Sequence, residues 1–304
     1  EDTFDTICDH FPDYGYSPFM NEKFFDDWTH DLKWGIHQAR CVVGHNLKVA
    51  WNLTRMHSLM PKESYKTFAH QIADAIPAAG CDNQRGGWYD MMERTLKDGE
   101  ENYRRVWHDR KAWWQQEQGI LAYYIMAGVY DDKPEYLNFA REGTAFYNGW
   151  FLDYESGGIY FNVLANGQPY ALGSERGKGS HSMAGYHSFE LCFLAAIYSN
   201  LLVNKQPMDF YFKPDPQGWP DNKLRVAPDL LPKGSVELSE VWIDDKNYTD
   251  FDKENMIVNL PESDKSLRVR VRIEPAGLGF SADLISFENG IGQFALDGDL
   301  SKQN

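Results

Sequence analysis

Residues 111–128 read KAWWQQEQGILAYYIMAG, and this stretch carries a clear helical signal. Its apolar residues recur every three or four positions, which is the period of a helix that buries one face. The same period predicts four more helices, at about 42–59, 63–78, 134–149 and 182–203. No convincing run of alternating strand residues separates them. The sequence therefore predicts an all-α region up to about residue 204.

Two of the connections between these helices share a short motif. Residues 86–90 read GGWYD and residues 157–162 read GGIYFN, so that Gly-Gly-x-Tyr recurs after about 70 residues. A spacing of this size is typical of a repeated supersecondary unit. We predict that pairs of helices recur along the chain.

The chain changes character after residue 204. Residues 205–235 contain six prolines, which disfavour helix interiors and central strands, so we predict a Pro-rich linker or extended segment. Beyond it, β-branched residues cluster at 236–243, 256–260 and 267–273 and predict the strands of a small β-rich, sandwich-like module over 236–275. We expect residues 276–304 to begin a further β-containing domain that is cut short.

Composition and charge exclude several classes of protein. The 304 residues are 42% hydrophobic and 15% aromatic, which is typical of a folded protein, and the formal charge of -15 opposes binding to nucleic acid or to an anionic membrane. No apolar run is long enough to span a membrane, and the acidic first residues lack the pattern of a signal peptide. The four cysteines are far apart and form no metal-binding motif. We expect a cytoplasmic protein without a metal; whether it forms a homo-oligomer stays open.

Two segments at predicted helix starts contain histidines. GHNLKVAW at 44–51 contains one, and KGSHSMAGYHS at 178–188 contains two. Histidine moves protons readily near neutral pH, although a histidine at a helix start also serves as a cap or packing residue. The adjacent tryptophans of residues 111–119 could be core residues or a platform for a sugar ring, with Gln and Glu neighbours to meet its hydroxyl groups.

Taken in order, these three segments resemble the N-acylglucosamine 2-epimerase and cellobiose 2-epimerase family over about residues 20–204. The resemblance implies a mainly α fold, an (α/α)6 toroid. The order of the motifs assigns residues 1–204 to the C-terminal half of that barrel, with the N-terminal half upstream of Glu1. It also implies catalysis without a cofactor, on a monosaccharide or small oligosaccharide.

The resemblance assigns roles to individual residues. His45 and His187 match the two catalytic histidines, and His181 is an alternative for the second because residues 178–187 also align with a gap. The tryptophans of the second motif match substrate-facing residues. The candidates for substrate binding lie in or beside these motifs: Lys48, Trp51, Trp113, Trp114, Glu117 and Gln118.

The implied chemistry takes place next to a sugar carbonyl. One histidine removes the proton from C2 of an open-chain aldose, and a planar enediolate forms. Return of a proton to the opposite face of C2 gives 2-epimerisation, whereas protonation at C1 gives aldose–ketose isomerisation. The sequence leaves both outcomes open.

Some residues depart from the family pattern and favour a different function. Lys48 and Gln118 stand where the family commonly has Glu, and Phe189 and Glu190 replace an Arg after the second histidine. An alternative is therefore a catalytically inactive carbohydrate-binding or scaffold domain in a multidomain regulatory protein, since residues 280–300 resemble the first strands of a STAS-type regulatory domain. A glycoside hydrolase is a further alternative, and its carboxylates would come from Asp90, Glu93, Asp109 and Glu117.

Overall fold

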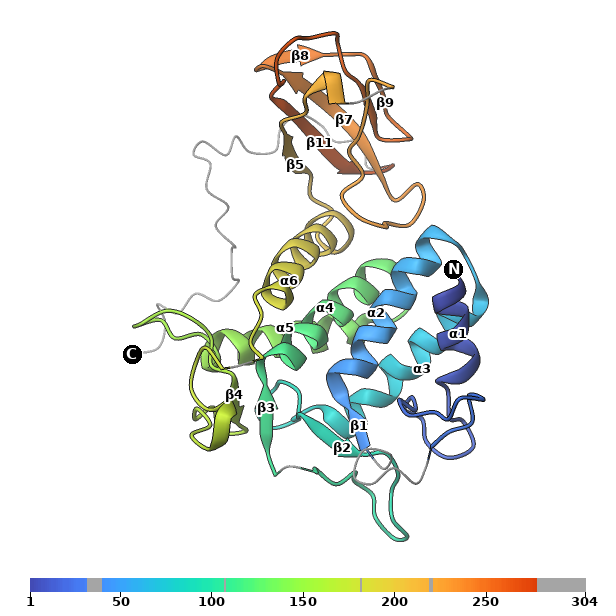
Figure 1. Cartoon of the computed structure of the whole chain (residues 1–304), viewed down its shortest axis with the longest axis vertical. Helices are drawn as coiled ribbons and strands as arrows, with labels where there is room; N and C mark the ends of the chain where they lie inside the picture. Colours follow the sequence, from blue (N-terminus) through green and yellow to red (C-terminus); the bar gives the residue numbers. More distant parts are fainter. Residues whose placement is uncertain (32–39, 107, 181, 219–220, 278–304) are drawn as a thin grey trace.

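The computed structural model describes residues 1–31, 40–106, 108–180, 182–218 and 221–277. Figure 1 shows a helical region with a β module beside one end of it. The helices are α1 (Asp2–His10), α2 (Val43–Leu59), α3 (Glu63–Gly80), α4 (Trp113–Val129), α5 (Pro134–Trp150) and α6 (Tyr186–Ile197), and α6 continues as a π-helical stretch, Tyr198–Val203. The five predicted helices are confirmed. The last begins later than expected, because residues 182–185 form turns and irregular chain that end at Gly185.

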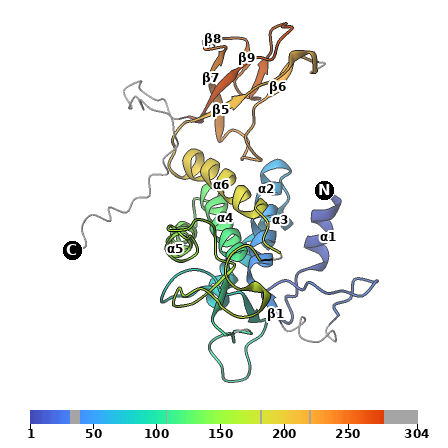
Figure 2. The ribbon, with the colours of Figure 1, turned by 60° about the vertical axis from the view of Figure 1, so that its left-hand side comes forward.

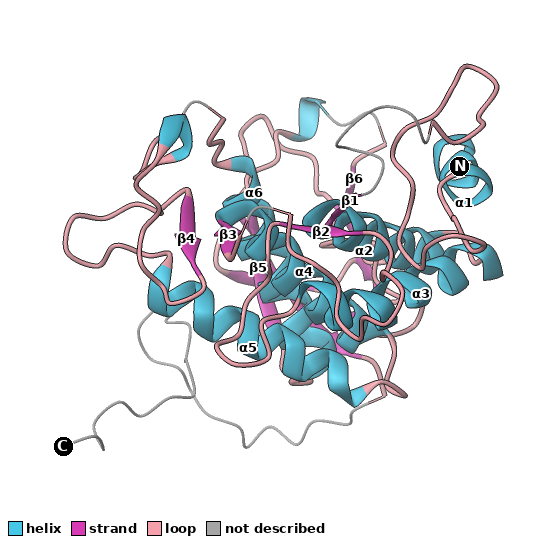
Figure 3. Cartoon of the chain, turned by 90° about the horizontal axis from the view of Figure 1, so that it is seen from below, coloured by secondary structure: helices cyan, strands magenta, loops and turns pink. Residues whose placement is uncertain are grey.

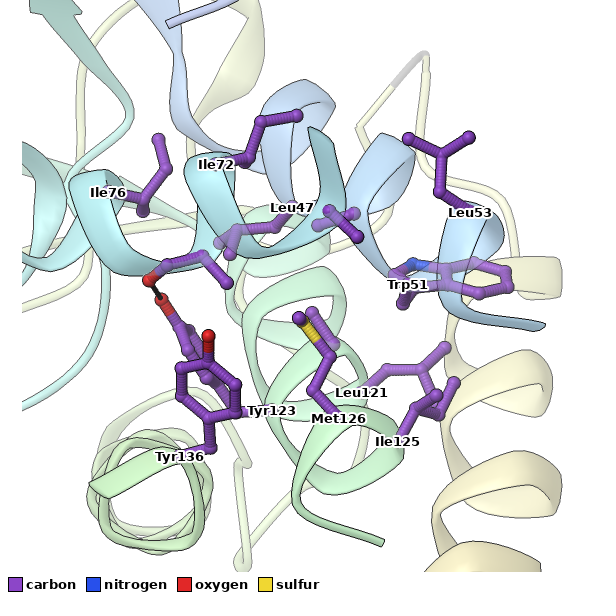
Figure 4. Packing of buried hydrophobic residues seen from close by; sticks show 14 of the residues in the cluster. Leu47, Trp51, Leu53, Ile72, Ile76, Leu121, Tyr123, Ile125, Met126 and Tyr136 are labelled. Carbon is purple, nitrogen blue, oxygen red and sulfur yellow. Dashed lines mark hydrogen bonds between the residues drawn. The ribbon is translucent and has the colours of Figure 1, made fainter. Parts of the chain in front are cut away.

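Helix α4 lies at the centre of the helical region. Twelve of its seventeen residues are buried, because α2, α5 and α6 all pack against it. Leu121 and Met126 of α4, Leu47 of α2 and Ile72 of α3 belong to one buried cluster, which Figure 4 shows. In the same core the hydroxyl of Tyr123 donates a 2.8 Å hydrogen bond to a backbone carbonyl of α3. The continuous apolar sequence of α4 after Gly119 is explained by this burial.

Short strands accompany the helix pairs, contrary to the all-α expectation. Strand β1 (Arg40–Val42) pairs with β2 (Met91–Glu93), and β3 (Arg110–Ala112) pairs with β4 (Asn162–Leu164); both pairs are antiparallel. Figure 3 shows them from below, next to the helix ends. Each strand has three residues, which is too short for an alternating pattern to appear in the sequence.

The predicted repeat is present as a strand, two helices and a returning strand. The unit β1–α2–α3–β2 recurs as β3–α4–α5–β4, and the starts of α2 and α4, at residues 43 and 113, differ by 70. The Val43 amide donates to the Asp90 carbonyl, and the Trp113 amide donates to the Phe161 carbonyl. Equivalent backbone hydrogen bonds therefore hold the first residue of α2 and the first residue of α4.

The Gly-Gly motifs are the hairpins that follow α3 and α5. In both, the two glycines have positive φ angles, between 72° and 84°, which favour glycine. In the first, the Asp82 carboxylate accepts hydrogen bonds from two backbone amides and forms an ion pair with Lys111. In the second, the Asp153 carboxylate accepts hydrogen bonds from the corresponding two amides and forms an ion pair with Lys178. We call these hairpin 1 (residues 82–93) and hairpin 2 (residues 153–164).

The β module contains two antiparallel sheets. The first has the order β5 (Met208–Phe212), β11 (Val269–Pro275), β7 (Val236–Ile243) and β8 (Lys246–Tyr248), and the second has the order β6 (Lys223–Arg225), β10 (Ile257–Asn259) and β9 (Phe251–Asp252). The three strands predicted after residue 235 are confirmed. The predicted linker, 205–235, instead supplies β5 and β6. Both are edge strands, where nearby prolines are tolerated because only one side is paired.

The β module packs on the helical region (Figure 2). Val236 and Ile273 of the module belong to the same buried core as α4 and the π-helical stretch. Asp229 pairs with Arg55 of α2 and accepts a 2.8 Å hydrogen bond from the Tyr198 hydroxyl. We expected a further domain at 276–304, with a STAS-type resemblance. The described residues end at Gly277, so this prediction lies outside them. Across the described ranges, no helix is both long and apolar enough to cross a membrane.

Candidate active site

A pocket of about 550 Å³ lies at the N-terminal ends of α2, α4 and α6. Its volume is in the range of small-ligand sites. The pocket brings together residues from all three sequence motifs and from the short strands. The lining residues are Glu22, Lys23, Arg40, Val42, His45, Lys48, Asp90, Met91, Arg110, Ala112, Trp113, Trp114, Phe161, Asn162, Glu175, Ser182, Tyr186 and His187.

Gly44 allows the first histidine to reach this pocket. A Cβ at residue 44 would lie 2.6 Å from the Trp114 ring and 2.8 Å from the Gln115 side chain, so a larger residue would push α2 away from α4. The Gly44 amide donates a 2.6 Å hydrogen bond to Oε1 of Gln115. This close approach puts the next residue, His45, beside the Trp114 indole, with 5.2 Å between ring centroids.

His45 is paired with a carboxylate. Its Nδ1 lies 2.7 Å from Oε2 of Glu22, and the ring is about half exposed. A carboxylate only accepts hydrogen bonds, so Nδ1 carries a proton and donates to Glu22. In the neutral ring, Nε2 then holds the lone pair. His45 is thus arranged as a base whose orientation is fixed by Glu22.

His187 lies in a different environment. It is buried at the start of α6, and its ring also packs on Trp114, at 5.9 Å between centroids. Burial, followed by the nearby positive charge of Lys48, lowers the pKa of His187 to about 4, although Glu190 opposes the shift. His187 is therefore neutral at physiological pH.

Gln118 joins His187 to Trp51 behind the pocket. Its Nε2 lies 3.1 Å from Nδ1 of His187 and 3.2 Å from Oε2 of Glu190, and its Oε1 accepts a 2.8 Å hydrogen bond from Nε1 of Trp51. Gln118 and Trp51 were candidates for substrate binding, but they are not among the lining residues. Gln118 contacts the histidine that does line the pocket, and Trp51 contacts Gln118.

Lys48 and Glu190 contact each other at the edge of the pocket. Nζ of Lys48 lies 3.7 Å from Oε2 of Glu190, and both side chains are partly exposed. Lys48 lines the pocket, whereas Glu190 does not. The positive charge of Lys48 is thus balanced by the carboxylate of Glu190.

Glu117 is fully buried away from the pocket. Its Oε1 accepts 2.6 Å hydrogen bonds from the hydroxyls of Tyr147 and Ser188. Burial raises the pKa of Glu117 to about 7, although the hydrogen bonds from Ser188 and Tyr147 oppose the shift. This carboxyl group, a candidate for substrate binding, connects α4 with α5 and α6.

A second polar cluster forms the strand side of the pocket. Nε of Arg110 donates a 2.7 Å hydrogen bond to Asp90, and Nη1 lies 2.7 Å from a Glu175 oxygen. Gln115 also donates to Asp90. Burial raises the pKa of Asp90 in spite of Arg110. Of the four carboxylates considered for a hydrolase, Asp90 lines the pocket, and Glu93, Asp109 and Glu117 do not.

Sequence reasoning missed Glu22, Arg110 and Glu175 as pocket residues. They are brought to His45 and Asp90 by contacts between distant segments, and no local motif marks them. The alternative histidine, His181, lies outside the described residues. Within the described part of the chain, no group of three or more His, Cys, Asp or Glu side chains could hold a metal ion.

The comparisons with known proteins concern the fold. No family model and no curated protein sequence matches this chain. Among solved structures, it is similar to the cellobiose 2-epimerase of Bacillus thermoamylovorans, with a TM-score of 0.51 and 19% identity over 64% of this chain and 45% of that chain. A sugar epimerase from a ruminal bacterium gives a TM-score of 0.51 and 13% identity over 65% and 46%, respectively. The cellobiose 2-epimerase of Spirochaeta thermophila gives a TM-score of 0.50 and 19% identity, over 64% of this chain and 44% of that chain.

These similarities bear on the predicted architecture. The neighbours are (α/α)6 toroid epimerases, and this chain spans less than half the length of each. Identities below 20% indicate a shared fold and leave the reaction open. This chain is therefore similar in fold, over about 64% of its length, to solved sugar epimerases.

Proposed function

We propose that this protein is a carbohydrate isomerase or 2-epimerase that moves a proton at the carbon next to the carbonyl of an open-chain aldose. The observation that carries the proposal is that His45 and His187 line one pocket and pack against the same indole, that of Trp114. The pocket volume of about 550 Å³ suits a monosaccharide or a small oligosaccharide.

The chemistry begins at His45. Its Nε2 lone pair removes the proton from C2 of the aldose, and the Glu22 carboxylate stabilises the imidazolium that forms. The electrons of the broken C–H bond form the C1–C2 double bond, and negative charge develops on the carbonyl oxygen. The ammonium group of Lys48 lines the pocket and favours this charge.

Trp113 and Trp114 would hold the sugar. Their indole surfaces can pack against the C–H faces of the chain or ring, while the charged side chains of Lys48 and Arg110, which line the same pocket, can meet its hydroxyl groups. The proposed binding thus combines apolar and polar sides of one pocket.

The experiment is exchange of the C2 proton. The protein is incubated in deuterated water with glucose, mannose, N-acetylglucosamine and cellobiose, and deuterium at C2 or C1 is followed by NMR. We expect incorporation with one of these sugars and its loss in His45→Ala. His57→Ala is the matched control, because His57 lies on the same helix and bonds to a backbone carbonyl outside the pocket.

A second candidate function is sugar binding without catalysis. It is favoured by Gln118 and Lys48, which occupy positions where the family commonly has carboxylates. Binding of a sugar in calorimetry, together with no exchange from any sugar of the panel, would establish this function and reject the isomerase.

A further inference from the structure

We propose that Gln118 fixes His187 in the tautomer with its proton on Nε2, so that the protein is an aldose–ketose isomerase with His45 as its single base. The inference rests on the proposed function and deepens it. It selects one of the two reactions that the fold and the paired histidines leave open. Gln118 acts through His187 and is a positioning residue.

The orientation of the Gln118 amide follows from its neighbours. The indole N–H of Trp51 can only donate, so the atom 2.8 Å from it is the amide oxygen. The amide nitrogen then faces Glu190, which as a carboxylate can only accept. Both partners demand the same orientation of the amide, and the reversed orientation would bring two donors together at Trp51.

The amide orientation determines the His187 tautomer. An N–H of Gln118 points at Nδ1 of His187 over 3.1 Å, so Nδ1 must accept and carries no proton. A neutral ring with an unprotonated Nδ1 has its proton on Nε2. Nε2 donates to no acceptor among the described residues, and His187 lines the pocket. The neutral ring thus offers a donor to the substrate.

The two histidines therefore have opposite roles. In His45 the carboxylate of Glu22 accepts from Nδ1, which leaves Nε2 as a base. In His187 the amide of Gln118 donates to Nδ1, which leaves Nε2–H as a donor. Protonation of His187 would also require Nδ1 to displace the Gln118 donor. Its burial and the adjacent Lys48 disfavour the charged ring further, since they lower the pKa to about 4 while Glu190 opposes them.

A neutral N–H donor changes the expected product. His45 takes the C2 proton, the C1–C2 double bond forms, and the carbonyl oxygen O1 becomes an oxyanion that accepts from His187 Nε2–H. The hydroxyl proton on O2 then moves to O1. The imidazolium of His45 returns its proton to C1, the double-bond electrons form the C1–H bond, and O2 forms the new carbonyl at C2. The product is a ketose, and no second base is needed.

The first test reads the tautomer directly. Long-range ¹H–¹⁵N correlation spectra of histidine-labelled protein distinguish protonated from unprotonated ring nitrogens, and a His187→Gln spectrum assigns the signals. We expect His187 with an unprotonated Nδ1 and a protonated Nε2 at pH 7. A protonated Nδ1 would overturn the proposal, whatever the sugar specificity.

Variants then test whether Gln118 is the cause. Exchange of the two side chains, Gln118→Glu with Glu190→Gln, keeps the charge and places a carboxylate next to Nδ1. We expect the His187 proton to move to Nδ1. Gln116→Glu is the matched control, because Gln116 is equally buried on α4 and bonds to backbone at Trp88 and Ala112. It should leave the tautomer unchanged; an unchanged tautomer in the exchanged variant as well would reject the role of Gln118.

Isotope transfer tests the reaction. With an aldose deuterated at C2, a single base carries part of the label to C1 of the ketose, and the exchanged variant should form more of the C2 epimer. Direct formation of a C2 epimer, with solvent hydrogen at C2 and no ketose, would reject the single-base inference but keep the proposed function. Absence of both exchange and product with every sugar would remove the proposed function itself, and the tautomer measurement would still stand apart from it.

Discussion

Hairpins 1 and 2 have the same backbone and differ in their surroundings. In each, an aspartate carboxylate accepts hydrogen bonds from two backbone amides of the turn and from a lysine. The lysine also donates a hydrogen bond to the carbonyl of the first glycine. Lys111, which pairs with hairpin 1, is fully buried and lies 3.8 Å from the centroid of the Phe146 ring, whereas the side chain of Lys178, which pairs with hairpin 2, is 29% exposed. The local residues fix the shape of the hairpin, but the packing of neighbouring elements decides how much each contact contributes to stability.

The largest expected difference comes from the two lysines. Lys111→Ala leaves Asp82 buried without its partner and should cost about 3 to 5 kcal/mol of unfolding free energy. Lys178→Ala breaks a partly solvated pair and should cost about 1 kcal/mol or less. Urea denaturation of the two variants measures both. Equal losses would show that burial does not distinguish the hairpins.

Glu117 is a buried carboxylate like Asp82 of hairpin 1, but its hydrogen bonds come from hydroxyl groups and not from a lysine. Lys111 helps to lower the pKa of Asp82, whereas burial raises that of Glu117 to about 7. Glu117 therefore favours the folded state below its unfolded pKa, and this contribution disappears as the pH rises through 7. The loss is about 3 kcal/mol at roughly 1.4 kcal/mol per pKa unit.

The test is the pH dependence of stability between pH 5 and 8. Glu117→Gln should abolish the decline that Glu117 causes over this range, and so stabilise the protein most at pH 8. Lys111→Ala, by contrast, should not remove it. A variant and parent with parallel pH profiles would contradict the raised pKa.

Alanine substitutions at the second glycine of each hairpin should differ by a smaller amount in unfolding free energy. Alanine at residue 87 or 158 adopts a left-handed backbone that costs roughly 1 to 2 kcal/mol in either hairpin. At Gly87 the added Cβ would also lie 2.7 Å from the Phe146 ring, while at Gly158 its nearest neighbour is Lys178 at 3.6 Å. Gly87→Ala should therefore cost about 2 kcal/mol more than Gly158→Ala. Thermal unfolding gives the comparison, and a larger loss at Gly158 would contradict it.

The smallest expected effect is on the pKa of Asp153 in hairpin 2. Lys178, together with backbone amides, lowers the pKa of Asp153 to about 2. Stability from this pair is therefore present above about pH 4 and is lost as the pH falls through 2. In Lys178→Ala the Asp153 pKa should rise toward its ordinary value, as NMR titration would show. The amides should keep part of the shift, and an unchanged pKa would exclude Lys178 as its main cause.

The sequence predicts the elements with strong periodicity. Helix α3 and strand β7 were found because their apolar residues follow one period over a long stretch. The edge strand β5 was not, since prolines on either side hid it, and its pairing with β11 joins residues about 60 positions apart. Three-residue strands such as β3 leave no periodic signal.

The pocket was predictable to the extent that its residues lie in local motifs. His45, Trp114 and His187 were singled out, and the structure brings them together. Glu22 reaches His45 through a fold of the chain that no motif encodes. The contacts of Gln118 depend on the approach of α2 and α6 to α4, so its influence on His187 could not be derived from spacing alone.

The position of the pocket at three helix starts has an electrostatic consequence. The N-cap residues of α2, α4 and α6 make no side-chain hydrogen bond to cap these helices. The dipole of each helix places partial positive charge at its first turn, worth about 0.3 to 1 kcal/mol for a nearby anion. Helix dipoles belong to the backbone. A pocket stripped of both histidines would therefore keep this partial positive charge, which offsets the carboxylates of Glu22, Asp90 and Glu175 that line it.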